Sequence, residues 1–104
     1  MSRRAQLESL LEADPRDPFL HYSLAMELQK EEVFDEALAR FEQVLELDAQ
    51  YVAAYKQKSR LLIKLGRHAD ARTALTAGIE AARAAGDQHA VDDLQQLLNT
   101  LQAT

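Results

Sequence analysis

Apolar residues recur every three or four positions along most of the chain, and short polar segments separate these runs. The clearest run lies near the C-terminus and contains Val91, Leu94, Leu97, Leu98 and Leu101. This spacing places apolar side chains on one face of an α-helix. We predict helices joined by connections of three to five residues, which favour antiparallel neighbours. The predicted helices cover residues 3–13, 18–31, 35–47, 52–65, 69–84 and 88–102.

Glycine, proline and aspartate residues indicate where these helices begin and end. Asp17 and Pro18 fit the N-cap and the first turn of a helix, where the missing N–H of proline costs nothing. Gly66 is expected to end a helix in the left-handed conformation. Gly86 and Asp87 repeat this pattern as a glycine stop followed by an aspartate cap.

The composition agrees with an all-α fold and excludes several kinds of chemistry. The 104 residues include 17 Leu and 18 Ala, whereas Val, Ile and Thr together number ten. Leucine and alanine favour helices, and strands prefer β-branched and aromatic residues. The absence of cysteine excludes disulfides, thiolate nucleophiles and zinc–thiolate sites. The length fits a single domain covering residues 1–104.

The chain ends and the hydropathy predict a cytoplasmic protein that does not enter a membrane. The N-terminal residues lack the apolar core of a secretory signal. No apolar run approaches the roughly 18 residues needed to cross a bilayer. The formal net charge of −5 argues weakly against general nucleic-acid binding.

The sequence repeats itself with a period of 34 residues, and the repeated unit is a helical hairpin. A shift of 34 residues places equivalent packing residues in register: Ala25 with Ser59, Leu28 with Leu62, Ala37 with Ala71, Phe41 with Leu75, and Leu45 with Ile79. The small residues at 25 and 37 allow two helices to approach closely, and the larger ones fill the space around that contact.

These residues resemble the tetratricopeptide repeat (TPR) family, whose 34-residue pattern places Leu, a small residue and an aromatic in one helix and A-x3-F in the next. Matching residues in the first unit are His21, Leu24, Ala25, Leu28, Ala37 and Phe41. The second unit matches through Tyr55, Ser59, Leu62, Ala71 and Leu75, and through the turn Leu65-Gly66-Arg67-His68. The chain departs from the pattern at Lys58, where Leu is expected, and at Glu32, which stands where the second unit has Gly66.

The resemblance implies a right-handed solenoid of helical hairpins. Its parts would be a leading half-unit at 1–17, repeats at 18–51 and 52–85, and a capping helix at 86–104. A capping helix seals the open end of such a stack, because the last apolar face cannot stay bare. The alternative is that its leucine stripe forms a dimer surface.

Charge is distributed unevenly along the chain. Residues 1–51 carry 5 basic and 12 acidic groups, whereas residues 52–104 carry 7 basic and 5 acidic groups. Lys56, Arg60 and Lys64 follow the i, i+4, i+8 spacing of one helix face. This stripe is either a solvated face or a cationic strip for a partner's acidic segment.

In the TPR family, the first helix of each hairpin lines a groove that binds peptides. The resemblance therefore implies partner-binding positions on both first helices: Phe19, Tyr22, Met26 and Lys30 in the first unit, and Lys56, Gln57, Arg60 and Lys64 in the second. Phe19 and Met26 could instead pack against the leading helix. Chaperone-tail adaptors of this family have Lys and Asn at the positions of Tyr22 and Met26, so that role is disfavoured.

Nothing in the sequence predicts catalysis, a metal site or a cofactor. His21, His68 and His89 are too far apart along the chain for a metal-ligand motif, and the first two are expected to be structural. No GxSxG motif or glycine-rich phosphate loop is present. We therefore predict a non-enzymatic protein–protein interaction module. The alternative is a protein that self-associates through its last helix or through its oppositely charged halves.

Overall fold

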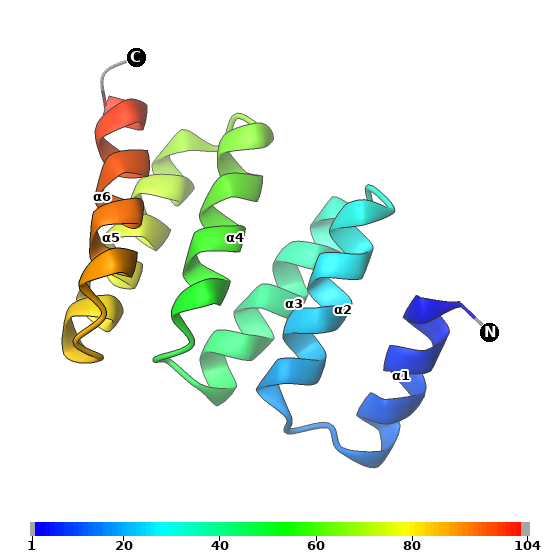
Figure 1. Ribbon diagram of the computed structural model, residues 1–104. Helices are drawn as coiled ribbons and strands as arrows, with labels where there is room; N and C mark the ends of the chain where they lie inside the picture. The colour runs from blue at the N-terminus through cyan, green and yellow to red at the C-terminus, as the bar shows by residue number, and fades with distance from the viewer. Residues whose placement is uncertain (1, 103–104) are drawn as a thin grey trace. The chain divides into compact units, whose positions relative to one another are not determined.

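The computed structural model describes residues 2–102, which form six α-helices and no strand (Figure 1). The helices are α1 (Arg3–Ala13), α2 (Pro18–Lys30), α3 (Phe34–Leu47), α4 (Val52–Lys64), α5 (His68–Ala84) and α6 (Gln88–Gln102). Every boundary lies within one residue of the predicted one, which confirms the all-α assignment. Met1 and residues 103–104, the ends of the predicted half-unit and cap, lie outside the described residues. No helix within 2–102 is long and apolar enough to cross a membrane.

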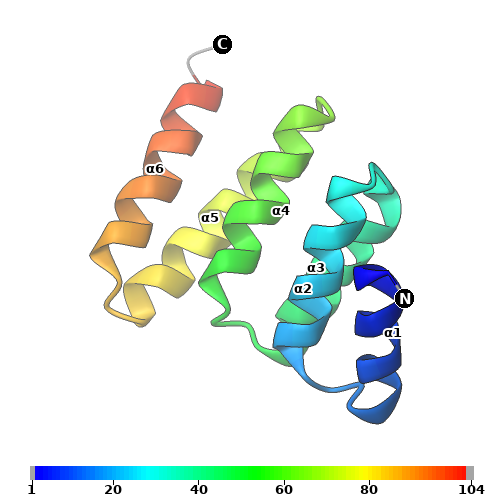
Figure 2. The same cartoon turned by 45° about the vertical axis from the view of Figure 1, so that its right-hand side comes forward.

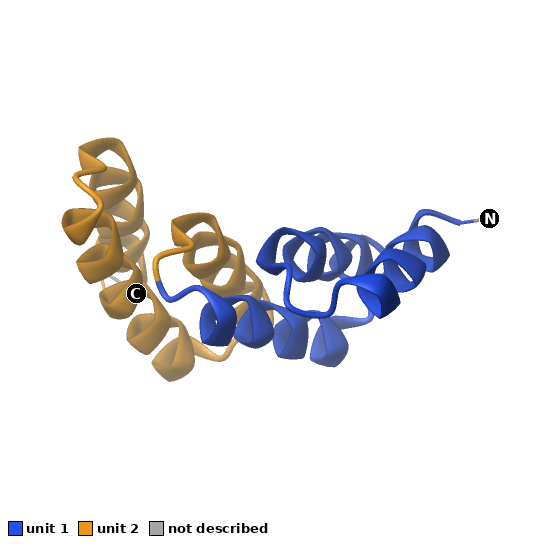
Figure 3. Cartoon of the chain, turned by 90° about the horizontal axis from the view of Figure 1, so that it is seen from below, with its two compact units in different colours: residues 1–49 blue, residues 50–104 orange. Residues whose placement is uncertain are grey.

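The chain divides into two compact units, residues 1–49 and 50–104, which Figure 3 distinguishes by colour. The first unit contains α1, α2 and α3. Helix α2 contacts both α1 and α3, and it shares its most extensive interface with α3. The buried residues come from all three helices: Leu7, Leu11, His21, Leu24, Ala25, Leu28, Ala37, Phe41 and Val44. Three- and four-residue spacing of these positions explains why the segments fold as amphipathic helices.

An arginine attaches α1 to the rest of the first unit. Arg4 donates a hydrogen bond to Glu31 at 3.2 Å and lies 3.8 Å from the carboxylate of Glu36. It also lies 3.7 Å from Glu8, one turn along its own helix. The hydrogen bond to Glu31 and the charges of the three carboxylates raise the pKa of Arg4 above its ordinary value. Arg4 thus links α1 to the C-cap of α2 and the first turn of α3.

The second unit contains α4, α5 and α6, with α5 packed against both other helices (Figure 2). Helix α6 also contacts α4. Alanine and leucine supply most of the buried surface, together with one serine: Ala54, Ser59, Leu61, Leu62, Ala71, Ala74, Leu75, Ile79, Ala81, Ala82, Val91, Leu94 and Leu101. The α6 stripe is therefore buried at three of its five predicted positions, while Leu97 and Leu98 are half-buried.

Three helices end in the same left-handed turn. Glu32, Gly66 and Gly86 have φ values of 63°, 76° and 71°. At each turn the next residue's N–H bonds to a carbonyl five positions back, as in Val33 to Leu28 at 2.9 Å. The left-handed residue also donates its own N–H to the carbonyl three positions back, which completes a Schellman motif. The predicted stops at Gly66 and Gly86 are confirmed.

Candidate protein-interaction site

Helix α2 carries the first set of predicted binding residues on one face. Asp17 caps this helix by accepting hydrogen bonds from the N–H groups of Phe19 at 2.9 Å and Leu20 at 3.4 Å. The cap begins the helix immediately before Pro18, as predicted. The face then follows helical spacing through Phe19, Tyr22, Met26 and Lys30. Local sequence therefore determines which side chains share this face of the first unit.

The apolar residues of this face differ in how firmly they are held. Phe19 leaves 59% of its surface exposed. Tyr22 is half-buried and makes an edge-to-face contact with Phe41 of α3, with ring centroids 6.0 Å apart. Met26 is half-buried, and Lys30 is exposed. The face therefore combines a fixed aromatic with an exposed one.

His21 lies on the opposite side of α2 and has a structural role, as predicted. It is 5% exposed, and its Nε2 lies 2.7 Å from the carbonyl oxygen of Pro15. Its Nδ1 lies 3.3 Å from Nη1 of Arg40. Since Arg40 can only donate, Nδ1 accepts and Nε2 carries the proton given to Pro15. His21 thereby joins the α1–α2 connection to α2 and α3.

The predicted binding residues of α4 do not form a uniform strip of available cations. Lys56 donates to Oδ2 of Asp93 on α6 at 3.2 Å. The same carboxylate oxygen lies 3.5 Å from Nε2 of His89. Arg60 is exposed and makes no ion pair within residues 2–102, while Gln57 is half-buried and Lys64 exposed. Lys56 is therefore paired with Asp93 inside the second unit, and a partner's carboxylate would compete with Asp93 for it.

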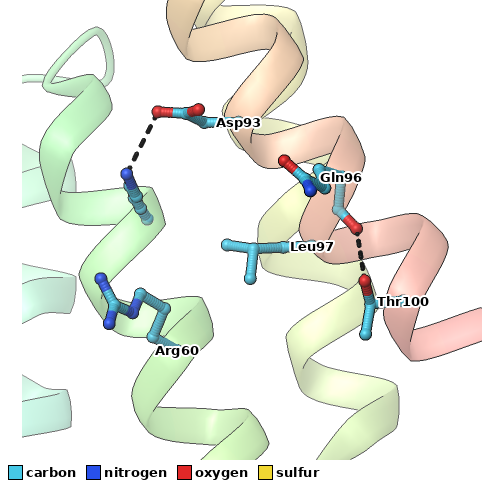
Figure 4. Close-up of a pocket in the computed structure, with 6 residues that line it drawn as sticks. Arg60, Asp93, Gln96, Leu97 and Thr100 are labelled. Atoms are coloured by element: carbon cyan, nitrogen blue, oxygen red, sulfur yellow. Dashed lines mark hydrogen bonds and ion pairs between the residues drawn. The ribbon is translucent and has the colours of Figure 1, made fainter.

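A hollow of about 300 Å³ lies between α4 and α6 in the second unit (Figure 4). Lys56 and Arg60 line it from α4. The other wall is made by α6 residues: Asp93, Gln96, Leu97 and Thr100. The sequence pattern did not point to these α6 residues, because the apolar stripe of this helix predicted a cap. The spacing of Asp93, Leu97 and Thr100 does place them on one face of α6, so the sequence contained an indication of this wall.

Two further residues that the sequence singled out are Lys58 of α4 and His68 of α5. Burial lowers the pKa of Lys58, and the nearby charge of Asp70 partly offsets this effect. Lys58 is half-buried, unlike the exposed Arg60. His68 begins α5 with an exposed side chain, so the structural role predicted for it is not found. Among the described residues, no group of three or more His, Asp or Glu side chains is arranged to hold a metal ion.

The 34-residue period and the hairpin geometry agree with a comparison against known families. The family model described as tetratricopeptide repeat matches residues 28–98. The chain belongs to the tetratricopeptide repeat family. Most of the TPR positions identified in the two helices of each unit are buried in the structure: His21, Leu24, Ala25, Leu28, Ala37, Phe41, Ser59, Leu62, Ala71 and Leu75. Tyr55 is half-buried. Lys58, the departure noted above, is half-buried at a position where the family has Leu.

Several solved structures are similar to this TPR chain. A TPR domain protein from Salinibacter ruber is 38% identical, with a TM-score of 0.81 and coverage of 86% of this chain and 91% of that one. A protein from Bordetella parapertussis is 31% identical, with a TM-score of 0.84 and coverage of 99% and 90%. The TPR2B domain of yeast Sti1, solved in complex with pHsp70, has a TM-score of 0.88 at 22% identity, covering 96% and 80%. None of the curated proteins matches the sequence significantly.

Proposed function

We propose that this TPR chain is a non-enzymatic module that binds a segment of another protein through the groove-lining faces that the family resemblance assigns to α2 and to α4. The observation that carries the proposal is the exposure of Phe19, 59% of whose surface faces solvent beside half-buried Tyr22 and Met26. Aromatic residues of this kind supply much of the binding energy at protein interfaces. Phe19 would bind an apolar residue of the partner, with Tyr22 and Met26 beside it.

On α4, the proposed binding residues are Lys56, Gln57, Arg60 and Lys64, and the partner segment would be acidic. The complex of the yeast TPR2B domain with pHsp70 supports peptide binding as a function of this fold. We do not extend that partner to this chain, because Tyr22 and Met26 stand where chaperone-tail adaptors have Lys and Asn.

The α2 face can be tested by comparing two exposed apolar residues of the first unit. Phe19→Ser should reduce crosslinked capture of partner proteins from cell extract, whereas Leu10→Ser should not. Leu10 is the matched control because it lies on α1 and is 51% exposed. Circular dichroism would confirm that both variants remain folded. Equal capture by the wild type and Phe19→Ser would contradict the proposal for α2.

The second candidate is a self-associating assembly protein. The apolar stripe of α6 is less exposed in the structure than dimerisation through it would require. Leu94 is fully buried and Leu101 is 6% exposed, so two residues of the predicted dimer stripe already pack within the second unit. The half-buried Leu97 and Leu98 are the remaining candidates from that stripe. The interaction module is therefore the better-supported proposal.

A further inference from the structure

Lys58 places a charged side chain at a packing position of the second unit. Its equivalent one repeat earlier is Leu24, which is 0% exposed. Ser59, the next residue along α4, is also 0% exposed, and Lys58 itself is half-buried. A charge at such a position loses part of its hydration, whereas a leucine gains stability from the same burial. The second repeat thus has an ammonium group where the first has an apolar side chain.

Two charged residues at the start of α5 lie near this ammonium group. Arg67 donates to Oδ2 of Asp70 through Nη2 at 2.9 Å and through Nε at 3.2 Å, so this carboxylate already has a cationic partner. Burial lowers the pKa of Lys58, the charge of Asp70 opposes this effect, and the charge of Arg67 adds to it. A lysine becomes more nucleophilic when burial or a neighbouring cation favours its neutral form.

We propose that Lys58 is a modification site at which the amine accepts an acetyl group from an acyl phosphate. The neutral nitrogen attacks the carbonyl carbon of the donor and forms the C–N bond of an amide. The C–O bond to the phosphate breaks, the phosphate leaves with the electron pair, and the nitrogen releases a proton to water. Lys58 is not one of the proposed partner-binding residues of α4, so this inference goes beyond the proposed function and does not depend on it.

The acetylated side chain suits this environment better than the unmodified lysine does. Acetylation removes the positive charge and keeps the aliphatic chain, so burial no longer removes hydration from an ammonium group. Arg67 and Asp70 balance each other's charge, and their pair does not require the charge of Lys58. Acetylation should therefore stabilise the second unit, because it makes position 58 uncharged like the equivalent Leu24.

The other three lysines of the chain provide internal controls: Lys30, Lys56 and Lys64. Lys30 and Lys64 are exposed, and Lys56 is bound to Asp93 at 3.2 Å. Accessibility alone would make the two exposed lysines react fastest, whereas a larger neutral fraction of the amine favours Lys58. The two explanations of reactivity therefore predict opposite orders.

The test measures acetylation of the full chain by acetyl phosphate at mildly alkaline pH, with the initial rate at each lysine determined by proteolysis and mass spectrometry. We expect Lys58 to react several-fold faster than Lys30 and Lys64 in the folded chain. In guanidinium chloride, which unfolds the chain, this difference should disappear. The rate at Lys58 should also level off at a lower pH in the folded chain than in the unfolded one, because burial lowers its pKa.

The variant Arg67→Gln tests the contribution of the neighbouring charges to the reaction. It removes a cation that repels the ammonium group and leaves Asp70 to stabilise that group, so acetylation at Lys58 should slow several-fold. Arg72→Gln is the matched control, because it removes an exposed arginine from the same helix. The rate at Lys58 should be unchanged in this control.

The variant Lys58→Gln resembles the acetylated side chain and tests the effect on stability. We expect the melting temperature of this variant, and that of the chain acetylated at Lys58, to rise by a few degrees. Lys58→Arg keeps the charge and should not raise it, and Arg72→Gln should change it little.

An acetylation rate at Lys58 no higher than at Lys30 and Lys64 in the folded chain would overturn the inference. A ratio of the rates at Lys58 and Lys30 that guanidinium chloride leaves unchanged would also overturn it, because the reactivity would then not arise from the fold. A lower melting temperature for both Lys58→Gln and the acetylated chain would refute the stabilising effect.

Discussion

Gly78 of α5 and Tyr55 of α4 meet so closely that a Cβ added at Gly78 would lie 2.7 Å from the Cβ of Tyr55. The same added atom would lie 3.1 Å from Cγ of Tyr55 and 3.2 Å from a methyl group of Leu94 on α6. Gly78 is fully helical and buried, so its role is the close approach of three helices rather than an unusual backbone conformation. This contact determines how tightly α5 packs in the second unit.

Gly78→Ala should therefore destabilise the protein, although alanine favours helices more than glycine does. Overpacking costs typically about 1–3 kcal/mol, and the helix-propensity gain is about 1 kcal/mol. We expect a net loss of about 1 kcal/mol in the free energy of unfolding, measured by urea denaturation. The exposed position Glu80 provides the control, because the difference between its Gly and Ala variants measures propensity alone. Net stabilisation by Gly78→Ala would show that α4 and α5 separate at little cost.

Glu32→Gly should stabilise the first unit. Glu32 has a φ of 63°, which costs a residue with a side chain roughly 1–2 kcal/mol and costs glycine little. We expect the free energy of unfolding to rise by about 1 kcal/mol and the melting temperature by a few degrees. Gly66→Ala is the matched control: position 66 has the same conformation and no atoms nearby, so alanine there should destabilise by a similar amount. If Glu32→Gly left the free energy of unfolding unchanged, this account of the turn would be contradicted.

Ser59→Ala should also stabilise the protein. Ser59 is 0% exposed, and its Oγ has no hydrogen-bond partner in the described structure. An unsatisfied buried hydroxyl costs about 1–3 kcal/mol, and alanine removes it without leaving a large cavity. Ser9→Ala on the exposed face of α1 measures the helix-propensity contribution by itself. If both substitutions had the same effect on the free energy of unfolding, the hydroxyl group of Ser59 would have to make a hydrogen bond in solution.

The protein should be monomeric in light-scattering experiments at low and high salt. The physical reason is that Leu94 and Leu101 are buried within the second unit and cannot also form a dimer surface. A dimer present only at low salt would instead indicate pairing between the acidic and basic parts of the chain, because salt screens such contacts. A dimer that persists at high salt and is lost in Leu98→Lys would indicate association through α6.

Local features of the sequence were sufficient to predict the helices and most of their ends. The caps at Asp17 and Asp87 act through hydrogen bonds to N–H groups within three residues, at 2.9 Å for Phe19 and 3.0 Å for Ala90. Gly66 ends α4 in the same way, through neighbours along the chain. The 34-residue period also identified most of its packing positions as buried ones, because helical hairpins repeat their packing at that interval, although Leu45 is half-buried.

The tertiary structure alone decided which groups from distant segments meet. The pair formed by Lys56 and Asp93 spans 37 residues, and it gives Lys56 an acidic neighbour that the sequence pattern did not indicate. The contact between Gly78 and Tyr55 and the α6 wall of the hollow arise in the same way. Helical periodicity predicts the face on which a side chain lies, but the partner it meets depends on how helices pack. The sequence therefore determined the helices and their faces, and packing determined the chemistry between α4 and α6.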